Sequence, residues 1–314
     1  GVGGNDDRPA GELPCRAHEV AQRGLETLGD HRPSLHHVGG FARIGRQVEE
    51  QETVRFHPDA SSDAARNSPP ASAGEAHTLL QMGLIDPYLS PGREGIPKDF
   101  MDEKGFWTAH YHFVVALGFN TQHIKPAEAP KNYEELLNPK WKGRLSLDPA
   151  DQDLFGALLL HWGKEKALTY FRNLAKLEPR MVSGHTQQAN LIGAGEIQMA
   201  PWLYGYRPLQ LKDEGAPVET VLFDPVLSNP AYLLLTKNSS HPHAAALFID
   251  WALAAEGGMK FFAEKFGRTP TRTGLKERFP KLRVDRYLVV KPEIVGPNFK
   301  EFTKLYYEIF GIGK

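Results

Sequence analysis

From about Ala76 onward, runs of β-forming residues alternate with helical segments, and this alternation limits the fold more than any other feature. One long strand or a pair of strands is predicted at residues 106–120, where β-branched and aromatic residues dominate. A helix is predicted at residues 164–177, because Leu168, Phe171 and Leu174 recur on one face. Further helices are predicted at residues 77–82, 133–137, 151–162, 186–193, 207–214, 242–254, 257–265 and 299–310, and further strands at 144–147, 197–204, 218–223 and 232–236. This order predicts an α/β architecture with mostly parallel, helix-covered sheets.

Size and composition exclude several classes of protein. The chain has 314 residues, of which 41% are hydrophobic, and its 37 Lys and Arg against 38 Asp and Glu leave a formal net charge of −1. A basic surface across the whole molecule is therefore excluded, and we expect no nucleic-acid partner. No apolar run approaches the roughly 18–20 residues of a membrane span. The single cysteine, Cys15, excludes an internal disulfide framework and a cysteine-based zinc site.

The first 75 residues do not share the alternating pattern. They are rich in Gly, Arg, His, Ser, Ala and Pro, they show no sustained strand or helix period, and no lysine precedes Lys98. One interpretation is a disordered leader or linker. The other, which we favour, is a segment translated out of frame from a GC-rich gene, since such translation yields these residue types. We expect no function in this segment.

Several segments resemble those of bacterial extracellular solute-binding proteins. The most specific is the block from Tyr133 to Gly143, which reads YEELLNPKWKG and precedes a predicted strand. The other segments are residues 79–88, 118–121, 184–186, 193–196, 215–218 and 238–251. Their order and spacing match over about residues 76–310. The chain therefore resembles type II periplasmic binding proteins of ABC importers, in the branch that includes ferric-iron-binding proteins.

The resemblance implies a two-lobed α/β fold in which a hinge closes the lobes over a ligand cleft. Residues 76–115 and 225–275 are expected to form the first lobe, residues 116–224 the second, and residues 276–314 a C-terminal helical region that packs on the lobes. Residues 1–75 stand where the first lobe should begin, and their length suits its opening strands and helices. The resemblance also implies a monomer without catalysis that delivers its solute to an ABC transporter permease. It would work in the periplasm, or at the cell surface of single-membrane bacteria.

The first candidate site is the Tyr-Gly-Tyr sequence formed by Tyr204, Gly205 and Tyr206. Ferric-binding relatives place two adjacent tyrosines here, because phenolate oxygens are hard donors that suit Fe(III). Tyr206 aligns with the second tyrosine of that pair, and Gly205 stands in place of the first. Tyr204 can substitute, since residues two apart on an extended chain point the same way. Fe(III) is accordingly the expected transported ligand, with Tyr206 and Tyr204 as metal ligands. The alternative is that one tyrosine is core and the other lines the cleft by stacking.

The second candidate site is the acidic turn at residues 148–153, which opens a predicted helix. Asp151 stands where aspartate usually caps a helix, and this is the structural interpretation. The functional interpretation is that Asp151 and Asp153 contact the ligand. Acidic groups at this position favour a cationic ligand or a metal and disfavour a bound anion.

The third candidate site is the loop formed by Ser183, Gly184, His185 and Thr186 at the start of a helix. Ser183 or Thr186 can cap the helix, and Gly184 lets backbone amides approach a ligand closely. His185 can contact an anionic group or a metal through a ring nitrogen. A plain helix cap is the alternative for this loop.

The alternative to a solute-binding protein is an enzyme, a transferase or lyase, on the same two-lobed scaffold. The sequence contains no nucleophile elbow, phosphate-binding P-loop, HExxH motif or dinucleotide fingerprint. Some transferases and lyases nevertheless share this two-lobed scaffold, so fold alone does not decide. An organic cation, a phosphonate or another small solute is the alternative to ferric iron.

Overall fold

The structure is a computed structural model that describes residues 72–313. The expectation for residues 1–75 falls, apart from its last four positions, outside the described residues. Those four positions begin the first described helix, α4 (Ala73–Gln81). Ser72 and Glu75 close a reciprocal capping box at its start, so regular structure begins before the predicted Ala76.

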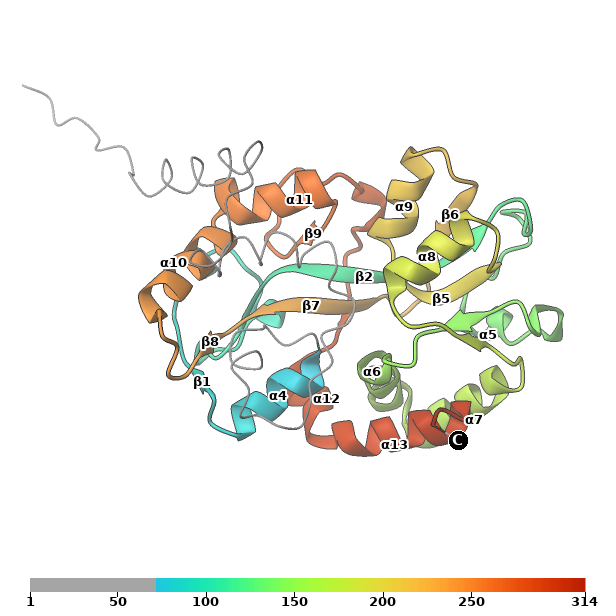
Figure 1. The fold of residues 1–314 in the computed structure, drawn as a ribbon, viewed down its shortest axis with the longest axis horizontal. Helices are drawn as coiled ribbons and strands as arrows, with labels where there is room; N and C mark the ends of the chain where they lie inside the picture. Colours follow the sequence, from blue (N-terminus) through green and yellow to red (C-terminus); the bar gives the residue numbers. More distant parts are fainter. Residues whose placement is uncertain (1–71, 314) are drawn as a thin grey trace, which may run out of the picture. The chain divides into compact units, whose positions relative to one another are not determined.

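The long strand β2 (Thr108–Asn120) organises the described part of the chain. Its first half pairs with β7 (Leu227–Leu233) and β9 (Thr269–Pro270), and its second half pairs with β5 (Met199–Tyr204) and β6 (Val218–Val221). The change of partner falls between two consecutive residues. Val114 lies opposite Ser228 of β7, whereas Val115 lies opposite Tyr204 of β5. Figure 1 shows β2 and β7 running side by side through the middle of the fold.

The prediction of mostly parallel sheets is wrong for the described residues. All four partners of β2 run antiparallel to it. Parallel pairing joins β7 with β10 (Leu288–Val289) and β3 (Ser146–Leu147) with β4 (Arg180–Met181), and a single parallel bridge joins Leu145 with Met199. An apolar strand buried on both faces has the same residue pattern in either orientation, so the strand pattern left its direction undetermined.

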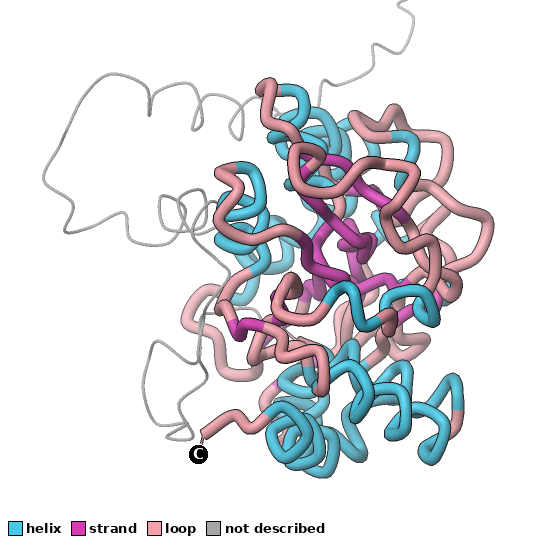
Figure 2. Tube along the Cα trace, turned by 90° about the vertical axis from the view of Figure 1, so that its right-hand side faces the viewer, coloured by secondary structure: helices cyan, strands magenta, loops and turns pink. Residues whose placement is uncertain are grey.

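The predicted helices are all present, with shifted ends at most of them. They are α5 (Tyr133–Leu136), α6 (Gln152–Trp162), α7 (Lys164–Ala175), α8 (His185–Gly193), α9 (Tyr206–Asp213), α10 (Pro242–Leu253), α11 (Lys260–Phe266) and α13 (Phe299–Phe310), together with α4. The short helix α12 (Pro292–Val295), the two-residue strands β1 (Ile85–Asp86) and β8 (Leu235–Thr236), and β9 and β10 complete the main elements. In the side view of Figure 2 the strands occupy the middle and helices lie around them.

The largest part of the core lies where α6, α7 and α13 meet β5. Phe155 of α6 contacts Phe171 of α7, with ring centroids 4.6 Å apart, and Phe171 reaches Trp202 of β5 at 5.6 Å. Tyr306 of α13 is fully buried against Phe155, and its hydroxyl donates a 2.7 Å hydrogen bond to the carbonyl of Asp148. The C-terminal helix therefore fixes the backbone just before α6.

The lengths and compositions of the described helices can be compared with those of a membrane span. None of them is long and apolar enough to cross a membrane.

Candidate solute-binding site

The two tyrosines of the first candidate site lie on either side of a change in backbone conformation. Tyr204 ends β5, Gly205 has helical dihedral angles (φ −55°, ψ −23°), and α9 begins at Tyr206. The chain is therefore not extended between the two tyrosines, as the prediction assumed, although both rings lie beside Phe113, with centroid distances of 4.1 Å for Tyr204 and 6.0 Å for Tyr206. Packing explains the glycine, because a Cβ at position 205 would lie 2.7 Å from Leu282 and 3.3 Å from the carbonyl oxygen of Val114.

Tyr204 is half-buried between aromatic rings from two other elements. Its ring stacks on Phe113 of β2, with centroids 4.1 Å apart and planes 11° apart. On α8, the ring of His185 lies 3.9 Å from the Tyr204 ring. The phenol oxygen accepts a 3.0 Å hydrogen bond from the side-chain amide of Asn229 on β7. Tyr204 thus joins β2, β5, β7 and α8 at the point where β2 changes partner.

Tyr206 is buried beneath an arginine that sequence analysis did not identify. The guanidinium of Arg268 lies 3.6 Å from the centre of the Tyr206 ring, within the range of a cation–π interaction. The rings of Phe113 and Tyr111 lie 5.0 and 5.7 Å from the same guanidinium. Arg268 follows the left-handed Gly267 and, by sequence alone, resembles any loop arginine. Only the packing of β9 against β2 brings it to this site.

Asp151 pairs with His185 and does not cap α6 through its side chain. The distance between Asp151 Oδ1 and His185 Nε2 is 3.2 Å, and both residues are buried. Asp151 occupies the capping position of α6, but its carboxylate accepts no hydrogen bond from the first turn, so the predicted side-chain cap is wrong. Burial raises the pKa of Asp151 to about 6, although the charge and hydrogen bond of His185 act in the opposite direction.

Asp148 connects the acidic turn to the loop before α8. Its carboxylate accepts hydrogen bonds from the backbone amides of Ala150, at 2.9 Å, and Gly184, at 2.7 Å. One backbone amide of the loop that was predicted to approach a ligand, that of Gly184, is therefore already bonded to Asp148. Gly184, with φ of +89°, also holds the capping position of α8, which was predicted for Ser183 or Thr186. Ser183 is exposed and Thr186 half-buried.

Asp153 has a structural role. Its two carboxylate oxygens accept hydrogen bonds from the amides of Ala73 and Gly74, at 2.8 and 3.2 Å, in the first turn of α4. Burial raises the pKa of Asp153 to about 7, although these two amides stabilise its charged form. Both carboxylate oxygens of Asp153 therefore bind the start of α4, whereas a ligand contact was predicted for this residue.

Comparison with known proteins identifies the family. Residues 74–286 match the model of a family described as bacterial extracellular solute-binding protein. The chain belongs to this family. The chain spans about three fifths of the length of the curated relatives it matches. These relatives include iron uptake protein A1 of Synechocystis sp., 26% identical over 210 residues that cover 62% of this chain and 58% of that protein. An uncharacterised protein of Haemophilus influenzae is 26% identical over 221 residues, covering 63% of this chain and 62% of that protein.

Solved structures of other binding proteins share the fold of this solute-binding protein. Iron-bound HitA from Pseudomonas aeruginosa has a TM-score of 0.68 at 17% identity, covering 93% of this chain and 95% of HitA. The periplasmic binding protein AfuA from Actinobacillus pleuropneumoniae, solved with exogenous fructose-6-phosphate bound, has a TM-score of 0.66 at 20% identity, covering 95% and 96% of the two chains. The prediction of a two-lobed α/β periplasmic-binding-protein fold is confirmed, whereas the residue limits assigned to each lobe stay a prediction.

The candidate residues of this solute-binding protein fall into two groups in the structure. Within residues 72–313, no three His, Cys, Asp or Glu side chains gather in a way that could hold a metal ion. The structure brings together Tyr204, His185 and Asp151, and it places Tyr206 against Arg268.

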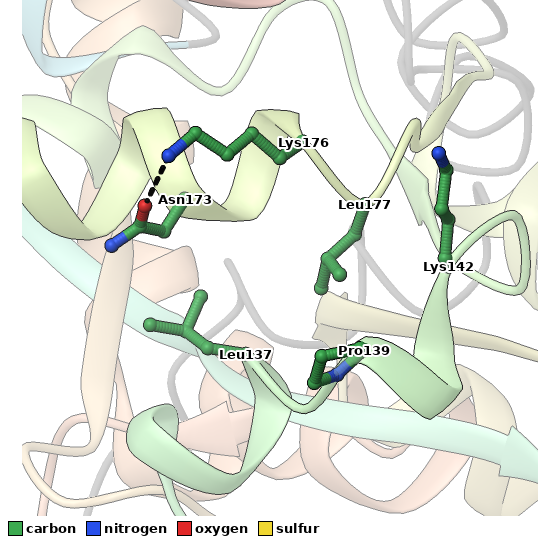
Figure 3. Close-up of a pocket in the computed structure, with 6 residues that line it drawn as sticks. All are labelled: Leu137, Pro139, Lys142, Asn173, Lys176 and Leu177. Carbon is green, nitrogen blue, oxygen red and sulfur yellow. Dashed lines mark hydrogen bonds between the residues drawn. The ribbon is translucent and has the colours of Figure 1, made fainter.

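A separate surface pocket lies on other elements of the solute-binding protein. It has a volume of about 290 Å³ and is lined by Leu137, Pro139, Lys142, Asn173, Lys176 and Leu177. Figure 3 shows these six side chains, with Lys176 donating a 3.0 Å hydrogen bond to Asn173. None of these residues belongs to the cluster around Tyr204.

Proposed function

We propose that this protein is the solute-binding component of an ABC importer, which captures one small solute and delivers it to a membrane permease. It acts as a monomer in the periplasm, or at the cell surface of single-membrane bacteria. Residues 76–115 and 225–275 form one lobe and residues 116–224 the other, so that β2 and the segment leading into β7 cross between them. Hinge closure around these crossings buries the solute.

One observation carries this proposal: the side chains of the cluster come from both halves of the sheet around β2. Tyr204 belongs to β5, which pairs with the second half of β2, and Asn229 belongs to β7, which pairs with the first half. Their side chains meet in the 3.0 Å hydrogen bond described above. A solute held against this pair contacts both halves of the sheet, and its binding energy therefore acts on the angle between them.

Ferric iron is the first candidate solute. Two observations support it: the curated relative named as an iron uptake protein, and the phenols of Tyr204 and Tyr206 in the cluster. Tyr206 and Tyr204 would be the metal ligands, with His185 and Asp151 lining the same site. Hard phenolate and carboxylate oxygens suit a small trivalent cation.

The test is titration of the full chain with Fe(III). Phenolate-to-iron charge transfer gives a visible absorption band, so we expect a band that Tyr206→Phe abolishes and Tyr204→Phe weakens. Tyr307→Phe is the matched control, because Tyr307 is 38% exposed on α13. A protein that stays colourless at saturating Fe(III) rules out iron as the solute.

The importer role is tested separately from the identity of the solute. A binding protein compacts when its solute binds, which small-angle scattering measures as a smaller radius of gyration, and it releases the solute unchanged. Turnover of a bound solute beyond one equivalent would replace this role with that of a transferase or lyase on the same scaffold.

A further inference from the structure

Arg268 is a buried cation that has no carboxylate partner among residues 72–313. It is 7% exposed, and none of the ion pairs in that part of the chain includes it. Its Nε and Nη1 atoms make no hydrogen bond with the described residues. Buried arginines in proteins are normally paired, because an isolated charge loses its hydration. An unpaired guanidinium beside the candidate site therefore indicates where a negative charge belongs.

The aromatic rings around Arg268 hold the guanidinium without using its donors. Tyr206 lies 3.6 Å from it, and Phe113 and Tyr111 complete the surround at 5.0 and 5.7 Å. A cation–π contact uses the face of the guanidinium, whereas its N–H groups lie at the edge. The side chain is thus fixed in place while donor nitrogens stay available to an anionic group.

Two buried acceptors lie along the same set of contacts. Asp151 Oδ2 and Asn229 Oδ1 make no hydrogen bond within the described part of the chain, although their residues are only 4% and 6% exposed. Asn229 donates to the Tyr204 hydroxyl, and Asp151 pairs with His185, whose ring lies on Tyr204. Tyr204 in turn stacks on Phe113, one of the rings beside Arg268. This series of contacts has the Arg268 cation at one end and the oxygen acceptors of Asp151 and Asn229 at the other.

We infer that the solute is a small organic anion that also carries hydroxyl or amine groups. Its anionic group binds Arg268, and its hydroxyl or amine hydrogens are donated to Asp151 and Asn229. This inference rests on the proposed importer function and competes with ferric iron for the same cluster, because the Arg268 charge, 3.6 Å from the centre of the Tyr206 ring, opposes a bare Fe(III) ion there. A solute of this class carries a hydrogen-bonding partner for each of these three buried polar groups.

The experiment compares matched solutes on the full chain by thermal shift and isothermal titration calorimetry. The panel pairs hydroxylated phosphates and carboxylates with their uncharged parents, for example glucose 6-phosphate with glucose, and includes inorganic phosphate and Fe(III). We expect at least one hydroxylated anion to stabilise the protein while its uncharged parent does not. Arg268→Gln should weaken that binding at least tenfold, and Asp151→Asn should weaken it several-fold.

The control is Arg207→Gln, which makes the same change at an arginine next to Tyr206 whose donors bind Asn190, Gln210 and Glu214. It should leave affinity unchanged. Arg268→Gln removes an unpaired buried charge, so the unliganded variant should melt no lower than the wild type, which separates loss of binding from loss of fold.

Three results would overturn the inference: no stabilisation by any anion of the panel, stabilisation by uncharged solutes or Fe(III) alone, or anion binding that Arg268→Gln leaves intact. Fe(III) binding that is insensitive to Arg268→Gln would overturn it while leaving the importer role standing. Turnover of a bound anion would reject the importer role while leaving the part of Arg268 in binding intact.

Discussion

Replacing Asp148 by alanine should lower the free energy of unfolding by about 3 kcal/mol, because two backbone amides lose their acceptor. No ligand contact is involved. The carboxylate accepts from Gly184 at 2.7 Å and from Ala150 at 2.9 Å. Hydrogen bonds to charged groups contribute about 1.5–3 kcal/mol each. Ala150 is exposed, so water replaces its lost partner, whereas the buried Gly184 amide is left without one and accounts for most of the cost. This is a large fraction of the 5–15 kcal/mol that typically stabilises a folded protein.

Urea denaturation followed by tryptophan fluorescence measures the effect, with the midpoint and slope fitted together. Asp148→Asn keeps one oxygen acceptor and should lose about half as much stability. Asp213→Ala is the control, because Asp213 pairs with Arg278 on the surface, and exposed ion pairs contribute about 0–1 kcal/mol. If Asp148→Ala and Asp213→Ala cost the same, Asp148 does not hold the loop before α8 and the reasoning fails.

Two further predictions concern the buried carboxylates and the glycine between the tyrosines. Burial raises the pKa of Asp151 to about 6 and that of Asp153 to about 7, above the ordinary value of 3.8, so the folded chain binds more protons than the unfolded chain between about pH 4 and 7. The free energy of unfolding should therefore fall as pH rises from 4 to 8. The double variant Asp151→Asn, Asp153→Asn should flatten this pH dependence, which urea melts at pH 5 and pH 8 measure. A double variant whose stability changes with pH as much as that of the wild type would contradict the prediction. Gly205→Ala should cost about 1–3 kcal/mol by overpacking against Leu282 and Val114, and unchanged stability in the same assay would refute the close packing there.

Local patterns predicted the elements whose structure is decided locally. Helix α13 has the predicted ends, residues 299–310, because Phe302 and Tyr306 lie one turn apart on a single buried face. The run of β-forming residues at 106–120 predicted either one long strand or a strand pair, and the structure has the long strand β2. The start of β7 was missed, since Pro230 argues against a strand, yet this residue lies opposite His112 in the sheet.

The site was predicted less well, because distant residues decide it. Asp151 has the sequence position of a helix cap, but folding places His185 within reach of its carboxylate, and that pairing replaces the cap. Arg268 lies 62 positions after Tyr206 in the chain, and no local pattern connects the two. The sequence identified Tyr204, Tyr206 and His185 as candidates through a family resemblance, while the charge beside them depends on how β9 packs against β2.

The hydrogen bond from Tyr306 to the Asp148 carbonyl connects the C-terminal helix to the candidate site. From the Tyr306 hydroxyl, two successive hydrogen bonds lead through Asp148 to Gly184, the residue before His185. A protease that trims α13, or a tag that strains it, would therefore act on the ring that lies against Tyr204, more than a hundred positions earlier in the chain. Shortened versions of this protein that end before Tyr306 would have an altered binding site even though no residue of that site had been changed.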